Sequence, residues 1–339
     1  MGLRTVLLTG GLGYIGSHTA VELAESGCRI VLLDNLANSS RSVLDGVAAI
    51  LGKIPTFYHL DVRNQEGVEE VLRREGVGTV VHFAGRKAVD ESINKPLEYF
   101  DCNFSGSLSL LQAMANSGVY NLVFSSSATV YGVPEFLPLD ETHATIPVNP
   151  YGRSKLYVEK VLEDLARSDA RWRIISLRYF NPVGAHHSAL IGDNPRGSPS
   201  NLMPYIARVA SGQLQNLNVF GDDYDTPDGT GVRDYLHVVD LAEGHVAALL
   251  KLGDRGFNYR TLNLGTGVGY SVLEVIRAFE RTNNVSVPYM IAPRRPGDLP
   301  VCYANPSLAC EVLGWRARRG IDAMCSSSWA FQKRSTIKI

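Results

Sequence analysis

The stretch Thr9-Gly10-Gly11-Leu12-Gly13-Tyr14-Ile15-Gly16 decides the fold of this chain. It follows the apolar run Val6-Leu7-Leu8 and fits the pattern G-x-G-x-x-G through Gly11, Gly13 and Gly16. Glycines at these positions allow a tight turn and let the backbone approach a pyrophosphate at the positive end of a helix. The stretch therefore predicts a strand, turn and helix that bind a dinucleotide, and the alternative is a glycine turn without a ligand.

An acidic residue after the next apolar run supports this prediction. Asp34 follows Ile30–Leu33 and stands eighteen residues after Gly16. A carboxylate at this point accepts hydrogen bonds from both ribose hydroxyls and repels a 2′-phosphate, so the cofactor is expected to be NAD rather than NADP. The alternative is that Asp34 only caps a turn with Asn35.

Short apolar runs alternate with helical stretches up to about residue 180. Because the runs are apolar on both faces, they are typical of buried parallel strands joined by crossover helices. Ser17–Ser26 is predicted to be one of these helices, with Gly27 after its end. The fold class is therefore α/β, a doubly wound parallel Rossmann sheet. The predicted strands contain Val6–Leu8, Ile30–Leu33, Thr79–Val81, Leu122–Phe124 and Ile174–Leu177.

From about Asn181 the sequence changes to loops rich in proline and glycine, with helices between them. We expect a smaller mixed α/β substrate-binding domain here. The predicted division is residues 1–180 for the NAD-binding Rossmann domain and residues 181–339 mainly for substrate binding. Leu262–Leu264 is a candidate for a strand that returns to the main sheet.

Composition restricts the partners. The 339 residues carry 33 basic and 34 acidic side chains, so no broad charged surface for nucleic acid or an anionic membrane is expected. The five cysteines form no C-x-x-C pair, which argues against a disulfide framework and a structural metal. The start of the chain has no apolar stretch long enough for a secretion signal or a membrane span. A cytoplasmic protein without a metal is expected.

Three polar residues form a candidate catalytic set. Tyr151 and Lys155 lie four residues apart in a segment that Asn149-Pro150 marks as the start of a helix, so their side chains share one face. The Lys155 ammonium can lower the pKa of the Tyr151 phenol and make it a usable base. Ser127 ends a predicted strand, and such strand ends converge on the ligand crevice. The alternative is an exposed helical face without a catalytic role.

Four stretches reveal a wider relationship: Gly10–His18, Ser125–Gly132, Tyr179–Ala185 and Gly229–Tyr235. In this order they resemble the UDP-hexose 4-epimerase family of the extended short-chain dehydrogenase/reductases. The resemblance runs from residue 5 to about residue 316, and only the tail Met324–Ile339 departs clearly from it.

The resemblance implies an activity and a cofactor. Tyr151 would take the proton of the sugar 4-hydroxyl while a hydride passes from C4 to NAD. Ser127 would shuttle or orient that proton, and Lys155 would hold the nicotinamide ribose. The 4-keto sugar would then rotate and accept the hydride on its opposite face, which interconverts UDP-galactose and UDP-glucose. NAD must stay bound because no net redox change occurs.

The resemblance also implies the binding residues, and a homodimer is expected. The arginines among the UDP-sugar residues, Arg233 and Arg295, suit a diphosphate because each planar guanidinium makes paired hydrogen bonds to phosphate oxygens. The alternative for these two arginines is a surface ion pair. The alternative for Lys87 is a solvated side chain. The NAD residues are Gly10, Gly11, Gly13, Tyr14, Ile15, Gly16, Asp34, Asn35, Asn38, Ser39, Asp61, Val62, Phe83, Ala84, Gly85, Lys87, Asn103, Tyr151, Lys155 and Phe180. The UDP-sugar residues are Ser127, Asn181, Asn201, Leu202, Asn218, Phe220, Arg233, Arg295, Asp298 and Cys302.

Cys302 bears on specificity. The resemblance places it beside the substrate sugar, where family members carry a tyrosine or a smaller residue. A cysteine leaves room for an N-acetyl group, so UDP-N-acetylglucosamine and UDP-N-acetylgalactosamine are expected as further substrates. The alternative is a small buried residue without influence on specificity.

Two other functions compete with this prediction. A sugar-nucleotide 4,6-dehydratase on the same scaffold would need an Asp-Glu pair, and Ser127-Ala128-Thr129 offers no acid. A regulatory dinucleotide-binding protein would keep the fold without the chemistry. The presence of the complete catalytic set argues against this second function.

Overall fold

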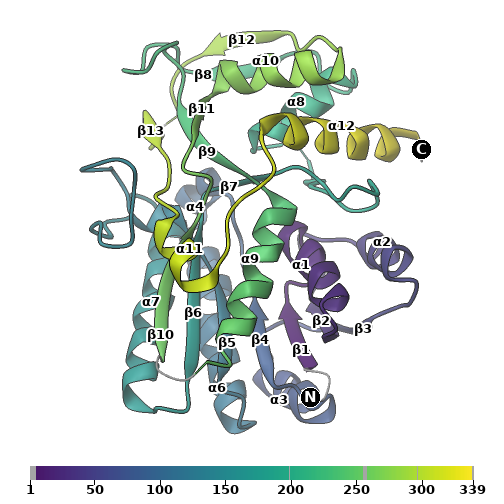
Figure 1. Cartoon of the computed structure of the whole chain (residues 1–339), viewed down its shortest axis with the longest axis vertical. Helices are drawn as coiled ribbons and strands as arrows, with labels where there is room; N and C mark the ends of the chain where they lie inside the picture. Colours follow the sequence, from purple (N-terminus) through teal and green to yellow (C-terminus); the bar gives the residue numbers. More distant parts are fainter. Residues whose placement is uncertain (1–4, 198, 255–257, 296, 338–339) are drawn as a thin grey trace.

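A seven-stranded parallel sheet forms the centre of the computed structural model, which describes residues 5–197, 199–254, 258–295 and 297–337. Its strands are β1 (Thr5–Thr9), β2 (Arg29–Asp34), β3 (Thr56–His59), β4 (Thr79–His82), β5 (Asn121–Ser127), β6 (Arg173–Tyr179) and β10 (Tyr259–Leu264). They lie in the order β10-β6-β5-β4-β1-β2-β3 and all neighbours are parallel (Figure 1). The chain order reverses between β1 and β4, which places the ligand crevice at their carboxyl ends. The prediction of a doubly wound parallel sheet is confirmed.

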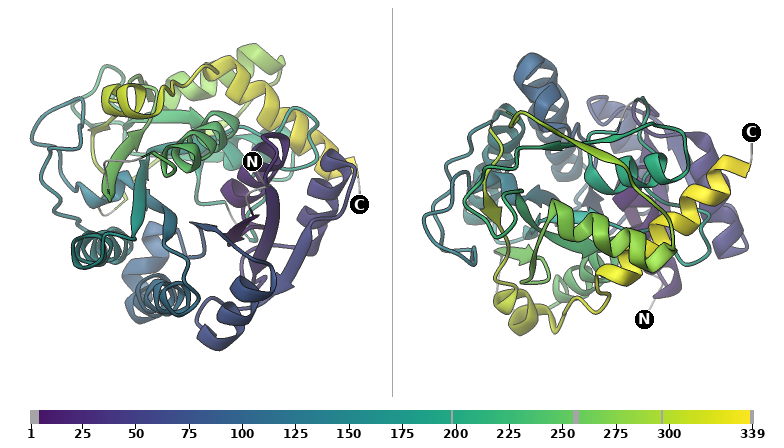
Figure 2. Two further views of the ribbon diagram at one scale, coloured as in Figure 1. Left: turned by 60° about the horizontal axis from the view of Figure 1, so that its bottom comes forward. Right: turned by 90° about the horizontal axis from the view of Figure 1, so that it is seen from above.

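Helices cover both faces of this sheet (Figure 2, left). Successive residues of β1 supply the two cores: Val6 and Leu8 pack with α1, α9 and α11, whereas Leu7 packs with α3, α6 and α7. These helices and their neighbours are α1 (Tyr14–Glu25), α2 (Arg41–Leu51), α3 (Gln65–Arg74), α4 (Val89–Asn94), α5 (Pro96–Tyr99), the π-helix η1 (Phe100–Ser105), α6 (Gly106–Asn116), the 3-10 helix η2 (Ala128–Val130), α7 (Pro150–Ser168), α9 (Val238–Lys251) and α11 (Ser307–Leu313).

The remaining elements form a second unit at the carboxyl ends of the strands (Figure 1). A four-stranded sheet contains β7 (Asn181–Val183), β9 (Val232–His237), β11 (Gly269–Ser271) and β13 (Val301–Cys302). A two-stranded sheet contains β8 (Leu217–Phe220) and β12 (Tyr289–Ala292), and the helices are α8 (Leu202–Ala210), α10 (Val272–Asn283) and α12 (Ile321–Ile337). Figure 2, right, shows α10 and α12 side by side.

Local sequence signals explain several element ends. The Asn149 side chain accepts a hydrogen bond from Gly152 N at 2.8 Å, so α7 begins with the predicted cap and with Pro150 in its first turn. Helix α1 begins at Tyr14, three residues before the predicted start, because Gly13 itself is the N-cap. In the divergent tail, Met324 and Cys325 of α12 are buried in the core of the second unit.

Candidate functional site

The glycine turn joins β1 to α1 at the crevice. Gly10 has a φ of +67°, and a Cβ there would lie 2.7 Å from Ala84 N. A Cβ at Gly16 would lie 2.3 Å from Gly10 O, so neither position accepts a larger residue. Gly13 caps α1 without a side-chain hydrogen bond to the helix. The bare turn and the first turn of α1 therefore fit the pyrophosphate of a dinucleotide.

Asp34 fixes the loop beside this turn. Its Oδ2 accepts from Leu12 N at 3.0 Å, and its Oδ1 accepts from Leu36 N at 2.9 Å and from Ser39 Oγ at 2.7 Å. The carboxylate thus connects the glycine turn with the loop after β2, and it also caps the turn that follows it. This position at the end of β2 suits a ribose, so the residues present fit the adenosine half of NAD.

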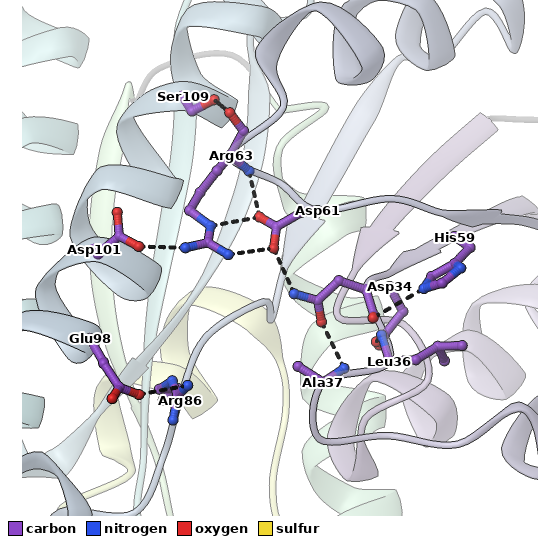
Figure 3. A network of polar contacts seen from close by, with 11 residues as sticks. Asp34, Leu36, Ala37, His59, Asp61, Arg63, Arg86, Glu98, Asp101 and Ser109 are labelled. Atoms are coloured by element: carbon purple, nitrogen blue, oxygen red, sulfur yellow. Dashed lines mark hydrogen bonds and ion pairs between the residues drawn. The ribbon is translucent and has the colours of Figure 1, made fainter. Parts of the chain in front are cut away.

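A charged network continues from this loop (Figure 3). Asn35 Nδ2 donates to Asp61 Oδ2 at 2.7 Å, and the Arg63 guanidinium donates to both Asp61 oxygens. These bonds, with that from Arg63 the largest cause, hold the pKa of Asp61 well below its usual range. Arg63 also pairs with Asp101. The network joins the predicted residue Asn35, which follows Asp34, to the predicted residue Asp61, and both Asn35 and Asn38 are exposed.

Asn103 connects the loop after β4 with α7, the helix that carries Tyr151 and Lys155. Asn103 lies in η1, and its side chain exchanges two hydrogen bonds with the backbone of Arg86, at 2.7 and 3.0 Å. It also donates to Ser154 Oγ of α7 at 3.1 Å. A Cβ at Gly85 would lie 3.0 Å from Asn103 Oδ1 and 3.7 Å from Lys155 Nζ. The predicted residues Gly85, Asn103 and Lys155 are therefore neighbours.

The candidate catalytic residues converge between β5 and α7. Ser127 ends β5, and its Oγ accepts from Thr129 Oγ1 at 2.9 Å. Lys155 is buried, and its Nζ donates to Ser125 O at 2.8 Å. Burial raises the pKa of Tyr151, and hydrogen bonding with Ser127 partly offsets this effect. Burial also lowers the pKa of Lys155 to about 8.

A buried ion pair lies one helical turn beyond Lys155. Glu159 is 3% exposed and Arg178 is 6% exposed, and two hydrogen bonds of 2.9 and 2.6 Å join them. Ser126 Oγ donates to Glu159 Oε1 at 2.6 Å. The pair fixes α7 against β5 and β6. Our sequence reasoning missed it, although Glu159 follows Lys155 by four residues and thus shares its helix face.

Two buried histidines also escaped prediction. His82 ends β4, with Nδ1 2.6 Å from Thr9 Oγ1 and Nε2 2.9 Å from Ser107 Oγ. His245 lies in α9, with Nε2 2.8 Å from the hydroxyl of Tyr179. Burial lowers the pKa of His82 to about 3 and that of His245 to about 4, so both are neutral near pH 7. A lone histidine in a sequence gives no signal of such pairing.

On the substrate side, two predicted arginines share one carboxylate. Arg233 Nη2 lies 3.8 Å and Arg295 Nε lies 3.5 Å from Asp298. The Arg295 guanidinium also lies over the ring of Phe220, 4.2 Å from its centroid. Asn218 is in the same strand, β8. The structure therefore brings these five predicted residues to one region.

Cys302 lies beside that region. In β13 it is the register partner of Arg233, and its side chain packs on a cluster that contains Phe180 and Val130. Burial raises the pKa of the thiol to about 11, so it is not a thiolate near pH 7. The other predicted substrate residues, Asn181, Asn201 and Leu202, begin β7 or flank the start of α8.

Asp234 ties these elements to the central sheet. The buried carboxylate accepts from Thr266 N and Oγ1, from Gly267 N at 3.0 Å and from Ala304 N at 3.1 Å. Thr266 and Gly267 follow β10 of the central sheet, and Ala304 follows Cys302. One side chain thus holds three segments together.

Sequence and structure comparisons identify the family of this chain. The model of the "NAD dependent epimerase/dehydratase family" matches residues 6–265. The chain belongs to this family. A UDP-glucose 4-epimerase of Bacillus subtilis is 54% identical over 328 residues, which cover 96% of each chain.

Two solved structures of UDP-glucose 4-epimerases are similar over nearly the full length. That from Stenotrophomonas maltophila, with bound NAD and formylated UDP-arabinopyranose, has a TM-score of 0.97 and 52% identity over 99% of this chain and 100% of that one. That from Bifidobacterium longum, in complex with NAD+ and UDP, has a TM-score of 0.95 and 50% identity over the same shares.

Membership of this epimerase/dehydratase family confirms three predictions. The chain is an NAD-dependent isomerase, NAD is its cofactor, and the family resemblance seen in the sequence is correct. Across the described ranges, no helix is both long and apolar enough to cross a membrane. The same ranges hold no group of three or more His, Cys, Asp or Glu side chains that could bind a metal ion.

Proposed function

We propose that this chain interconverts UDP-galactose and UDP-glucose through a 4-keto intermediate. The observation that carries the proposal is the convergence of Ser127, Tyr151 and Lys155 at the end of β5, next to the loop after β4. Ser127 ends a strand of the sheet, and Tyr151 and Lys155 share one face of α7. The identity of about half of all residues with named UDP-glucose 4-epimerases supports it.

Each catalytic side chain has a distinct role in this proposal. When bound, NAD would supply the acceptor for a hydride from sugar C4 and the source of its return to the opposite face of the ring. The Tyr151 phenolate oxygen accepts the proton of the 4-hydroxyl and gives it back in the second half of the cycle. Ser127 Oγ connects the phenol with the sugar oxygen. Lys155 holds the nicotinamide ribose and provides a positive charge near the phenol.

The electrostatics of Tyr151 add a requirement. In the chain alone burial raises the pKa of the Tyr151 phenol, and Ser127 offsets only part of that effect. The phenolate therefore needs nearby positive charge, which the Lys155 ammonium and the nicotinamide ring would both provide. Tyr151 is thus expected to act as a base only when the cofactor is bound.

The region around Asp298 suits a sugar nucleotide. Arg233 and Arg295 would bind the diphosphate, since both guanidinium groups lie within reach of one carboxylate, Asp298. The Arg295 guanidinium lies over the ring of Phe220, and Phe220 belongs to β8 together with the predicted residue Asn218. A diphosphate would compete with Asp298 for the two arginines.

A second substrate pair is part of the proposal. Cys302 stands in register with Arg233 and packs near Phe180, and these two contacts support a position between the proposed diphosphate and nicotinamide sites. A thiol there occupies much less space than a tyrosine ring. We therefore propose that UDP-N-acetylglucosamine and UDP-N-acetylgalactosamine are also interconverted.

Three broader expectations stay proposals. The NAD-binding domain is proposed for residues 1–180 and the UDP-sugar domain mainly for residues 181–339. A homodimer is supported by exposed apolar side chains on α4, α5 and α7, namely Ile93, Leu97 and Tyr157, which are 49%, 82% and 46% exposed. A cytoplasmic location is supported by the thiol state of Cys102, Cys302, Cys310 and Cys325.

The function is tested by chromatography of the products. The NAD-loaded protein is incubated separately with UDP-galactose and with UDP-N-acetylgalactosamine, and Tyr151→Phe is assayed in parallel. We expect both glucose-configured products, and a loss of about 10²–10⁴ in rate for the variant, since a general base is removed while the ring is kept. A 4,6-dehydratase would instead release water and yield a 4-keto-6-deoxy sugar. A regulatory protein would bind NAD and convert nothing.

A further inference from the structure

One loop of the second unit reaches across to the NAD-binding unit. We call residues 185–197, between β7 and α8, the crossing loop. It folds back on itself, since Ala185 and Gly192 form an antiparallel bridge and His186 N donates to Ile191 O at 3.3 Å. It lies between α12 and α2 in Figure 1. None of its residues belongs to the sites predicted from the sequence.

An apolar anchor holds the tip of the crossing loop on the NAD-binding unit. Ile191 is 1% exposed and packs in a cluster with Val21 of α1 and Val47 of α2. Gly46 makes this approach possible, because a Cβ there would lie 2.8 Å from Leu190 O. The contact therefore depends on a glycine in α2 and on an isoleucine in the loop.

A second attachment is polar and reaches the adenosine side of the site. The Arg196 guanidinium donates to the carbonyls of Ala37 and Ser39, to the former at 3.2 Å. These residues belong to the loop that Asp34 organises, in which Ser39 Oγ donates to the Asp34 carboxylate. Arg196 and Asp34 thus both bind the loop after β2: Asp34 from within the NAD-binding unit, and Arg196 from the crossing loop.

A third attachment joins the crossing loop to the segment after β4. Asp193 Oδ1 lies 3.6 Å from Lys87 Nζ, in the segment after β4. The Asp193 side chain is 11% exposed, and its Oδ2 also accepts from Asn201 Nδ2 at 3.3 Å. Asn201 is the N-cap residue of α8 in the second unit. The carboxylate therefore bridges the two units beside Lys87, whose ammonium lies 5.7 Å from the ring centroid of Tyr14 in the first turn of α1.

The second unit keeps the crossing loop in place from behind. Arg208 of α8 donates to the carbonyls of Pro195 and Gly197, at 2.6 and 2.5 Å. Gly192 lies against the ring of Phe331 in α12, since a Cβ at Gly192 would lie 2.5 Å from that ring. The loop is thus fastened to its own unit by these contacts.

We propose that Arg196 and Asp193 are positioning residues that slow the release of NAD. The inference rests on the proposed function, in which NAD is regenerated in place and its loss stops the cycle. The crossing loop connects the loop around Asp34 with the segment around Lys87, so the dinucleotide leaves only when these attachments break. The residues act through the two loops that border the cofactor.

The test measures cofactor release from the NAD-loaded protein without any UDP-sugar. Protein-bound NAD is followed over time after rapid gel filtration into buffer, for wild type, Arg196→Ala, Arg196→Lys and Asp193→Asn. We expect release about tenfold faster for Arg196→Ala, because two charge-assisted hydrogen bonds to carbonyls are lost. Arg196→Lys should lie between that variant and wild type, since an ammonium keeps the charge without the planar fork. Asp193→Asn should accelerate release to a smaller extent.

Arg281→Ala is the matched control. Arg281 also forms a surface ion pair, with Asp322 at 2.7 Å, but within the second unit. NAD should leave Arg281→Ala at the same rate as wild type, and circular dichroism should show that all variants are folded. Equal release from wild type and Arg196→Ala would overturn the proposal. Because no sugar is present, this outcome is independent of epimerisation, which fails or succeeds in the separate product assay.

Discussion

Replacement of Glu159 by glutamine tests whether the buried ion pair supports both stability and the catalytic lysine. Glu159→Gln keeps the volume and the acceptor oxygen but leaves the Arg178 guanidinium without a counter-charge. Removal of one partner of a buried ion pair costs about 3–5 kcal/mol. For 339 residues the unfolding entropy is about 0.7 kcal/mol per kelvin, so Tm should fall by about 4–7 °C.

The measurement is thermal unfolding of the NAD-loaded protein, with Glu163→Gln as control. Glu163 lies in the same helix and pairs with Arg167 at 2.6 Å, but that pair is on the surface. Its loss should cost less than about 1 kcal/mol and lower Tm by about 1 °C. If both variants lower Tm equally, the buried pair has no special role and the reasoning is wrong.

The pH profile gives a second readout that a purely structural role would not change. Burial lowers the pKa of Lys155 to about 8, and the Glu159 charge works against this decrease. Loss of that negative charge should lower the pKa of Lys155 further. The epimerisation rate, which needs the charged ammonium, should then fall at a lower pH in Glu159→Gln than in wild type. If the rate falls at the same alkaline pH in both proteins, Glu159 does not influence the catalytic lysine.

Four further predictions concern other parts of the molecule. Asp34→Ala should weaken the preference for NAD over NADP, measured as the ratio of their dissociation constants, because the carboxylate that repels a 2′-phosphate is gone. Cys302→Tyr should suppress conversion of UDP-N-acetylgalactosamine while UDP-galactose is still converted, which product chromatography of both reactions reports. His82 and His245 have pKa values of about 3 and 4 in the folded protein and near 6.5 in the unfolded chain, so the unfolded state binds more protons below pH 6.5. Each histidine should therefore lower the free energy of unfolding by about 1.4 kcal/mol at pH 5.5 relative to pH 7.5, which urea unfolding at the two pH values measures. Leu97→Glu should shift the mass measured by light scattering from dimer to monomer, and a wild-type monomer would refute the dimer.

The central sheet was predictable because its signals are local. Runs such as Ile30–Leu33 are apolar on both faces, and each lies within an observed strand. β3 was missed because Thr56–His59 is a short edge strand whose residues are only partly buried. Helix η1 was not predicted, and its Asn103 bonds to Ser154 of α7, a residue 51 positions away that no local pattern connects with it.

The site was predictable to the extent that it follows strand ends and a recognisable motif. The turn glycines, Asp34 and the Tyr151 helix all stand where the sequence places them. Contacts between distant segments were not predictable. The bond from Ser126 to Glu159 and the contact of Arg196 with Ser39 join residues 33 and 157 positions apart, and nothing local in the sequence connects them.

The late position of β10 has a consequence for synthesis on the ribosome. β10 pairs along its whole length with β6, yet eighty residues separate Tyr179 from Tyr259. While those residues are being made, β6 is an open edge with the apolar residues Ile174, Ile175 and Leu177 and unpaired backbone groups. Such an edge is a template for pairing with another nascent chain. We therefore expect the first 180 residues to be prone to aggregation until β10 is made, and expression of the amino-terminal half alone should yield insoluble protein.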